Sequence, residues 1–125
     1  MPGNILIVDD SPTLRASIGF CLQNAGYEIF EAINGQDGLE ALTRLKEEGE
    51  SVSLIITDMN MPVMDGIRFI KEVKDTPFRF IPILVLSTET QEELKKEAKR
   101  LGASGWLLKP FRPEQLLWAV KKFIR

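Results

Sequence analysis

Residues 54–66, LIITDMNMPVMDG, show most directly how this chain is expected to fold. The stretch opens with an apolar run, Leu-Ile-Ile, whose β-branched residues are typical of a buried strand. The run ends at Asp58, and Asp65-Gly66 then indicates a turn and the start of a helix. Ligands of open α/β sheets bind at the carboxyl edge of the strands, so Asp58 is a candidate site residue. An aspartate at such a place is by itself more typical of a turn or a helix cap.

The same order, a short apolar run followed by a helical pattern, recurs along the chain. Helix starts are indicated by Ser11-Pro12, by Asn34-Gly35 and by a capping box of Thr90 with Glu93. This alternation predicts an α/β fold with a five-stranded parallel sheet, doubly wound, and helices on both faces. We expect strands at residues 5–8, within 27–33, and at 54–57, 81–86 and 106–108, and helices at about 12–25, 35–48, 66–74, 90–101 and from 113 onward.

Length and composition are typical of a globular protein. The 125 residues fit one domain over residues 1–125, and we expect no output domain. No apolar run approaches the roughly 20 residues needed to span a bilayer, so no membrane association is expected. The single Cys21 cannot form an internal disulfide and no signal peptide is visible, which favours a cytoplasmic location. The net charge of −2 gives nucleic-acid binding no electrostatic support.

Histidine is absent from the chain, and this excludes several kinds of chemistry. No Ser-His-Asp or Cys-His nucleophile can be built, and a histidine-ligated zinc site is excluded as well. The chain also cannot carry a phosphohistidine itself. Any bound metal should therefore be a hard cation with oxygen ligands.

Polar residues follow four of the predicted strands, namely Asp9-Asp10, Asp58, Ser87 and Lys109. In a parallel sheet these strand ends meet at one edge, where two carboxylates about 4 Å apart repel by roughly 4 kcal/mol at an effective dielectric near 20. Mg²⁺ suits this edge because it binds carboxylates and completes its shell with water and phosphate oxygens. Asp58 could then attack phosphorus, with Mg²⁺ and Lys109 balancing the charge. Each residue taken alone could also be structural.

Four motifs at these strand ends resemble one known family. They are ILIVDDS at residues 5–11, the Asp58 stretch with its Met-Pro and Asp-Gly pairs, LVLS at 84–87 and LLKPF at 107–111. Together they resemble the receiver domain of response regulators in two-component signalling, most closely the single-domain, CheY-like type. The resemblance covers nearly the whole chain and implies a flavodoxin-like sheet with strand order 2-1-3-4-5. It also implies a signalling switch, not a turnover enzyme, that catalyses its own phosphorylation and dephosphorylation.

The resemblance implies roles for the residues at the sheet edge. Asp58 matches the aspartate that accepts a phosphoryl group from the phosphohistidine of a sensor histidine kinase. Asp10 matches a direct Mg²⁺ ligand and Asp9 a ligand that acts mainly through water. Asn60 matches the position whose backbone carbonyl binds the metal. Lys109 matches the lysine that pairs with the phosphoryl group.

Further positions match the switch and the decay of the phosphoryl group. Ser87 matches the hydroxyl residue that turns toward the phosphoryl group, and Trp106 the aromatic that then packs inward. That aromatic is usually Tyr or Phe, and the larger indole makes full burial of Trp106 harder. Asn60 and Glu89 match the pair that tunes attack of water, and this pair predicts a short-lived phosphoryl group. An unknown output protein is expected on the face of the fourth helix, fifth strand and fifth helix, where an exposed Trp118 would add to the contact.

Alternative functions remain open from the sequence. The receiver could serve as a phosphate sink, or regulate a kinase without a downstream motor target. A phosphatase of the haloacid-dehalogenase type also uses a strand-end aspartate, but it has an acid/base aspartate where this chain has Asn60. A flavodoxin-like cofactor binder would need a phosphate-binding loop after the first strand, where Asp9-Asp10 would repel phosphate.

Overall fold

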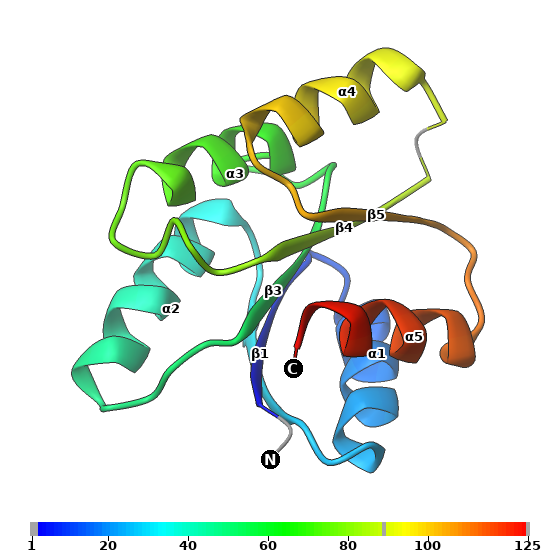
Figure 1. Ribbon diagram of the computed structural model, residues 1–125. Helices are drawn as coiled ribbons and strands as arrows, with labels where there is room; N and C mark the ends of the chain where they lie inside the picture. Colours follow the sequence, from blue (N-terminus) through cyan, green and yellow to red (C-terminus); the bar gives the residue numbers. More distant parts are fainter. Residues whose placement is uncertain (1–2, 89, 125) are drawn as a thin grey trace.

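The computed structural model describes residues 3–88 and 90–124, in which strands and helices alternate (Figure 1). The strands are β1 (Asn4–Val8), β2 (Glu28–Ala32), β3 (Leu54–Asp58), β4 (Ile83–Ser87) and β5 (Gly105–Leu108). The helices are α1 (Pro12–Asn24), α2 (Gly35–Glu47), α3 (Gly66–Lys74), α4 (Glu92–Leu101) and α5 (Pro113–Phe123). Within the described ranges, no helix is both long enough and apolar enough to cross a bilayer.

The five strands form one parallel sheet in the order β2-β1-β3-β4-β5, so the predicted fold class and strand order are confirmed. Strand β2 lies on one side of β1 and β3 lies on the other, so the topological switch point of the sheet is between β1 and β3. Open α/β sheets bind their ligands at this point. Val8 of β1 pairs in register with Thr57 of β3. The next residue on each strand, Asp9 and Asp58, therefore emerges side by side at the carboxyl edge.

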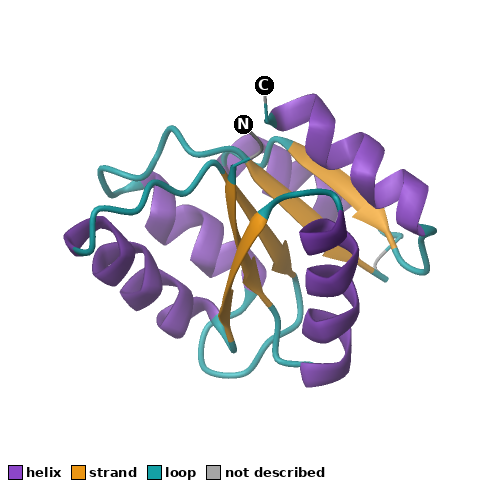
Figure 2. Cartoon of the chain, turned by 90° about the horizontal axis from the view of Figure 1, so that it is seen from below, coloured by secondary structure: helices purple, strands orange, loops and turns teal. Residues whose placement is uncertain are grey.

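Helices cover both faces of the sheet (Figure 2), and each face has its own core of buried side chains. On one face α1 and α5 bury side chains such as Leu22 and Val120 against the strands. On the other face α2, α3 and α4 bury Leu42, Phe69 and Ala98. Successive residues of β1 point alternately into the two cores. Burial on both faces explains why the strands are almost continuous apolar runs.

The start of α4 differs from the sequence prediction. This helix begins at Glu92 with Gln91 as its cap, so the capping box expected of Thr90 and Glu93 is wrong. A capping box needs its acidic residue at the third helical position, whereas Glu93 occupies the second. The other helix and strand ends agree with the predicted ranges within two residues, the usual uncertainty of such boundaries.

Candidate functional site

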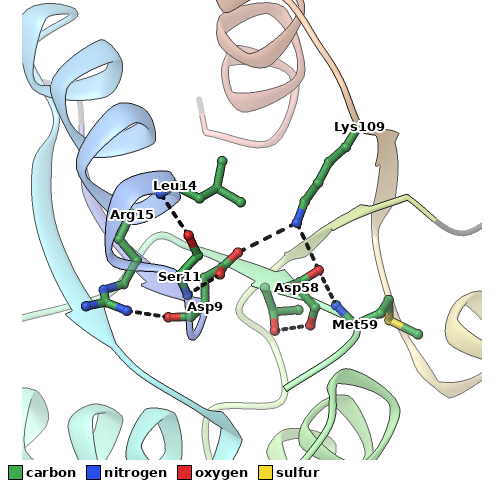
Figure 3. A network of polar contacts seen from close by, with 8 residues as sticks. Asp9, Ser11, Leu14, Arg15, Asp58, Met59 and Lys109 are labelled. Carbon is green, nitrogen blue, oxygen red and sulfur yellow. Dashed lines mark hydrogen bonds and ion pairs between the residues drawn. The ribbon is translucent and has the colours of Figure 1, made fainter. Parts of the chain in front are cut away.

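The carboxyl edge of the sheet brings together side chains from three strand ends (Figure 3). Asp9 follows β1, Asp58 is the last residue of β3, and Lys109 follows β5. The carboxylate of Asp10 joins them, because the ligand oxygens of Asp9, Asp10 and Asp58 all lie within 4.8 Å of one another. The structure thus places these four predicted site residues in one cluster.

Asp58 presents its carboxylate in a nearly closed setting, with 12% of the side chain exposed. Its Oδ1 accepts the backbone N–H of Met59 at 2.9 Å and a hydrogen bond from Lys109 Nζ at 3.1 Å. Two donors on one oxygen restrict rotation of the carboxylate. The orientation of Asp58 is therefore set before any ligand arrives.

Asp9 is buried, with 2% of its surface exposed. Its Oδ1 accepts the N–H of Ser11 at 2.8 Å, which closes the turn between β1 and α1. Its Oδ2 has no hydrogen-bond partner among the described residues and lies 3.8 Å from Lys109 Nζ. A buried charged oxygen without a hydrogen bond is unfavourable, so this atom is a strong candidate for contact with a cation or its bound water.

The ionised form of Asp9 is electrostatically unfavourable in the folded protein. Burial raises the pKa of Asp9 above its ordinary value of 3.8, and the charges of Asp58 and Asp10 raise it further. The Ser11 N–H and the Lys109 ammonium act in the opposite direction but do not cancel this rise in pKa. The ionised carboxylates therefore destabilise one another, and a cation entering between them would relieve the repulsion.

The donor atoms of the cluster fit Mg²⁺. Among the described residues, the cluster offers carboxylate oxygens as side-chain ligands, and Oδ2 of Asp9 has no hydrogen-bond partner there. Asp10 is exposed, so this side of the cluster is accessible to the waters and phosphate oxygens that Mg²⁺ keeps as ligands. Asp9, Asp10 and Asp58 are the side chains that would hold the ion.

The remaining predicted site residues lie around this cluster. Asn60 is exposed, two residues beyond Asp58, and its carbonyl as a metal ligand stays a prediction. Ser87 is fully buried at the end of β4, where its carbonyl accepts the N–H of Lys109 at 2.8 Å. This bond holds the loop that carries Lys109 against β4. Glu89 lies outside the described residues.

The two tryptophans differ in burial. Trp106 of β5 pairs with Val85 and packs against the core beneath α2, α3 and α4, yet it remains partly exposed. Two surface hollows of about 250 and 260 Å³ border it, and Lys95 of α4 lines both. Trp118 of α5 is 69% exposed, as its position off the inward face of the helix predicts.

Gly66 allows α3 to begin close against the backbone of the site. Its N–H donates to the carbonyl of Met59 at 2.8 Å. A Cβ atom on Gly66 would lie 2.5 Å from the carbonyl oxygen of Asp58 and 2.7 Å from Cα of Met59. A larger residue would therefore push on the backbone that carries Asp58. The sequence indicated a turn at Gly66 but not this close approach.

Arg15 makes a contact at the site that the sequence prediction missed. Its Nη1 donates to the carbonyl of Asp9 at 2.7 Å, and its Nε donates to Glu31 at 3.0 Å. One signal was present in the sequence. A cation near the N-terminus of a helix is disfavoured by the helix dipole, which favours a role for Arg15 outside its own helix.

Comparison with known proteins identifies the family to which this chain belongs. The family model of the response regulator receiver domain matches residues 5–121. The chain is 35% identical over 113 residues to the chemotaxis protein CheY1 of Helicobacter pylori, covering 90% of this chain and 89% of that protein. The structure of the chemotaxis response regulator CheY4 of Vibrio cholerae has a TM-score of 0.87 and 42% identity, covering 99% of this chain and 100% of that chain. These matches confirm the resemblance seen in the motifs, and the chain belongs to the response regulator receiver domain family.

Proposed function

We propose that this receiver accepts a phosphoryl group on Asp58 from the phosphohistidine of a sensor histidine kinase. Mg²⁺ would be held by Asp9, Asp10, Asp58 and the carbonyl of Asn60. The observation that carries the proposal is the Asp58 carboxylate, which Lys109 contacts at 3.1 Å beside a cluster of acidic oxygens. The protein would act as a stand-alone response regulator in a phosphorelay or chemotaxis-type pathway. The 35% identity to the chemotaxis protein CheY1 supports a chemotaxis-type role.

The residues at the sheet edge have separate roles in the transfer. An oxygen of Asp58 attacks the phosphorus, the phosphorus–nitrogen bond of the donor breaks, and the imidazole leaves with the bonding electron pair. When bound, Mg²⁺ supplies positive charge against the phosphoryl oxygens. Lys109 pairs with the same oxygens, since its ammonium already lies beside Asp58. The product is an aspartyl phosphate, which Asn60 and Glu89 make short-lived by holding a water in line with it.

The switch follows from the charge added to Asp58. Ser87 is buried at the end of the neighbouring strand, and its hydroxyl can donate to an anionic phosphoryl oxygen. Such a charge-assisted bond is strong, so Ser87 moves toward the phosphoryl group. That movement opens space beneath Trp106 and changes the face of α4, β5 and α5 that meets the output partner. The phosphoryl group shifts this equilibrium only by its different affinity for the two states.

Phosphorylation by phosphoramidate tests the proposal, because this small donor carries a phosphorus–nitrogen bond like that of phosphohistidine. The intact mass of the wild type should increase by one phosphoryl group, and only when Mg²⁺ is present. Asp58→Asn should show no increase, and Asp10→Asn should need more Mg²⁺. Asp65→Asn is the matched control, since the carboxylate of Asp65 caps α3, does not belong to the acidic cluster, and is replaced by asparagine, which caps equally well. Undiminished phosphorylation of Asp58→Asn would reject Asp58 as the acceptor.

A further inference from the structure

Arg15 joins three elements of the fold next to the acidic cluster. Its side chain extends from α1, is 14% exposed, and donates from Nη1 to the carbonyl of Asp9 at 2.7 Å (Figure 3). Its Nε donates to Oε1 of Glu31 in β2 at 3.0 Å. The rigid, planar guanidinium suits such a double contact. One side chain therefore fixes the end of β1 to both α1 and β2.

Asp9 is held through nearly all of its polar atoms. Its N–H donates to the carbonyl of Ala32 at 3.1 Å, its carbonyl accepts from Arg15, and its Oδ1 accepts from Ser11. Only Oδ2 lacks a hydrogen-bond partner in the part of the chain that the structure describes, and Lys109 is 3.8 Å from it. The three bonds orient the turn so that the one unbonded oxygen lies in the acidic cluster.

The charge of Arg15 alone would act in the opposite sense to its hydrogen bond. A guanidinium near three carboxylates repels an entering cation, so removing the charge should strengthen cation binding if charge were all that mattered. Glu31, however, already pairs with this guanidinium at 3.0 Å and offsets part of its charge. We therefore expect the hydrogen bond to Asp9 to be the larger contribution. The two effects predict opposite changes in Mg²⁺ affinity, which makes them separable.

We propose that Arg15 is a positioning residue for the Mg²⁺ site, a role that rests on the proposed function. By holding the carbonyl of Asp9, Arg15 fixes the turn that carries both Asp9 and Asp10. It thereby sets where these two carboxylates meet that of Asp58. Mutating residues behind the direct ligands of a metal commonly lowers its affinity 10–100-fold. Because Arg15 acts through the backbone of one ligand, we expect a smaller change, roughly three- to tenfold weaker Mg²⁺ binding in Arg15→Gln.

Calorimetric titration of Mg²⁺ into the wild type and Arg15→Gln tests this role. Arg100→Gln is the matched control, because Arg100 also donates to a glutamate, Glu97, at 3.2 Å, but from α4 on the opposite face of the sheet. Arg15→Lys keeps the charge but not the planar guanidinium that reaches both Asp9 and Glu31. Its affinity for Mg²⁺ should therefore fall between that of the wild type and that of Arg15→Gln. Exchange of the Ser11 amide in metal-free protein gives a second readout, which does not depend on Mg²⁺. Urea unfolding shows whether each variant is folded.

The positioning role is supported if Arg15→Gln binds Mg²⁺ several-fold more weakly than the wild type and exchanges its Ser11 amide faster. Arg100→Gln should match the wild type in both measurements. Equal or tighter binding by Arg15→Gln overturns that role and leaves the proposed function standing. A wild type that binds no Mg²⁺ overturns both the positioning role and the proposed function.

Discussion

Lys109 Nζ lies 3.1 Å from Asp58 Oδ1, and this ion pair links the loop after β5 to the end of β3. The lysine side chain is 18% exposed and the carboxylate 12%, so water screens the pair only in part. The backbone of Lys109 is held in turn by the carbonyl of Ser87. Its positive charge is therefore in place before a phosphoryl group arrives, and charge arranged in advance is what lowers a barrier most effectively.

Replacing Lys109 by methionine should slow the phosphorylation of Asp58. Methionine keeps an unbranched stem but has no charge, so the phosphoryl oxygens lose a partner in the transition state. We expect the rate with phosphoramidate and saturating Mg²⁺ to fall roughly tenfold or more. Lys121→Met is the control, because Lys121 is an exposed lysine of α5. Equal rates for Lys109→Met and the wild type would remove this lysine from the reaction.

Asp9→Asn should stabilise the metal-free protein. Burial and the charge of Asp58 raise the pKa of Asp9 in the folded state, so its ionised form lowers the free energy of unfolding. The sign follows from the raised pKa: the destabilisation by the ionised carboxylate is absent below the ordinary pKa of 3.8, grows as the pH rises from there to the folded-state pKa, and is constant above it. We expect the variant to be more stable than the wild type by about 1 kcal/mol at neutral pH, with the difference vanishing in acid.

Urea unfolding of Asp9→Asn and the wild type, with a chelator present, measures this difference. Saturating Mg²⁺ should shrink or reverse it, because an ion that binds only the folded wild type stabilises it by mass action. If the variant is the less stable protein at neutral pH without metal, burial of the charge and repulsion within the acidic cluster do not outweigh the favourable contacts of the Asp9 carboxylate.

Gly66→Ala should destabilise the protein and slow its phosphorylation. The added Cβ would lie 2.5 Å from the carbonyl oxygen of Asp58, so the backbone at the acceptor must shift. We expect a loss of about 1–3 kcal/mol in the free energy of unfolding, as for other overpacked sites. Gly19→Ala is the matched control, because its Cβ would meet only Ile29, at an ordinary 3.7 Å, and alanine favours a helix. Identical urea midpoints for the two variants would mean that the close approach at Gly66 has no consequence.

Trp106 should report a change at the face of α4, β5 and α5 when the site is occupied. Beryllofluoride with Mg²⁺ serves as the phosphoryl mimic, and Trp118→Phe is the background because Trp118 is 69% exposed and would obscure the signal. As Ser87 moves toward Asp58, the partly buried ring of Trp106 should pack more deeply and its emission should change. If emission, quencher access and hydrogen exchange of α4 all stay constant, another surface carries the output.

The residues of the sheet edge could be predicted from the sequence because the relevant pattern is local. Each apolar run ends in a polar residue, and a parallel sheet brings the carboxyl ends of its strands to one edge. Asp9, Asp58 and Lys109 could therefore be placed together from the sequence, and the structure shows them in contact. The order of the strands, in contrast, came from the family resemblance.

Contacts between distant segments could not be predicted in the same way. The bond from Arg15 to the carbonyl of Asp9 depends on how α1 lies against β1, which no local pattern specifies. The space for Gly66 likewise depends on how closely α3 returns to Asp58. The start of α4 was misplaced because a Thr-x-x-Glu pattern does not determine the backbone conformation of Gln91, the observed cap.

Identification of the residue that carries the phosphoryl group is the most direct test of this account. Borohydride reduces an aspartyl phosphate to homoserine, so peptide mass spectrometry can locate the acceptor. After treatment with phosphoramidate and Mg²⁺, homoserine should be found at position 58 alone, and chelation of Mg²⁺ should abolish it. Homoserine at Asp9 or Asp10, or none at Asp58 in protein that has taken up a phosphoryl group, would contradict the account.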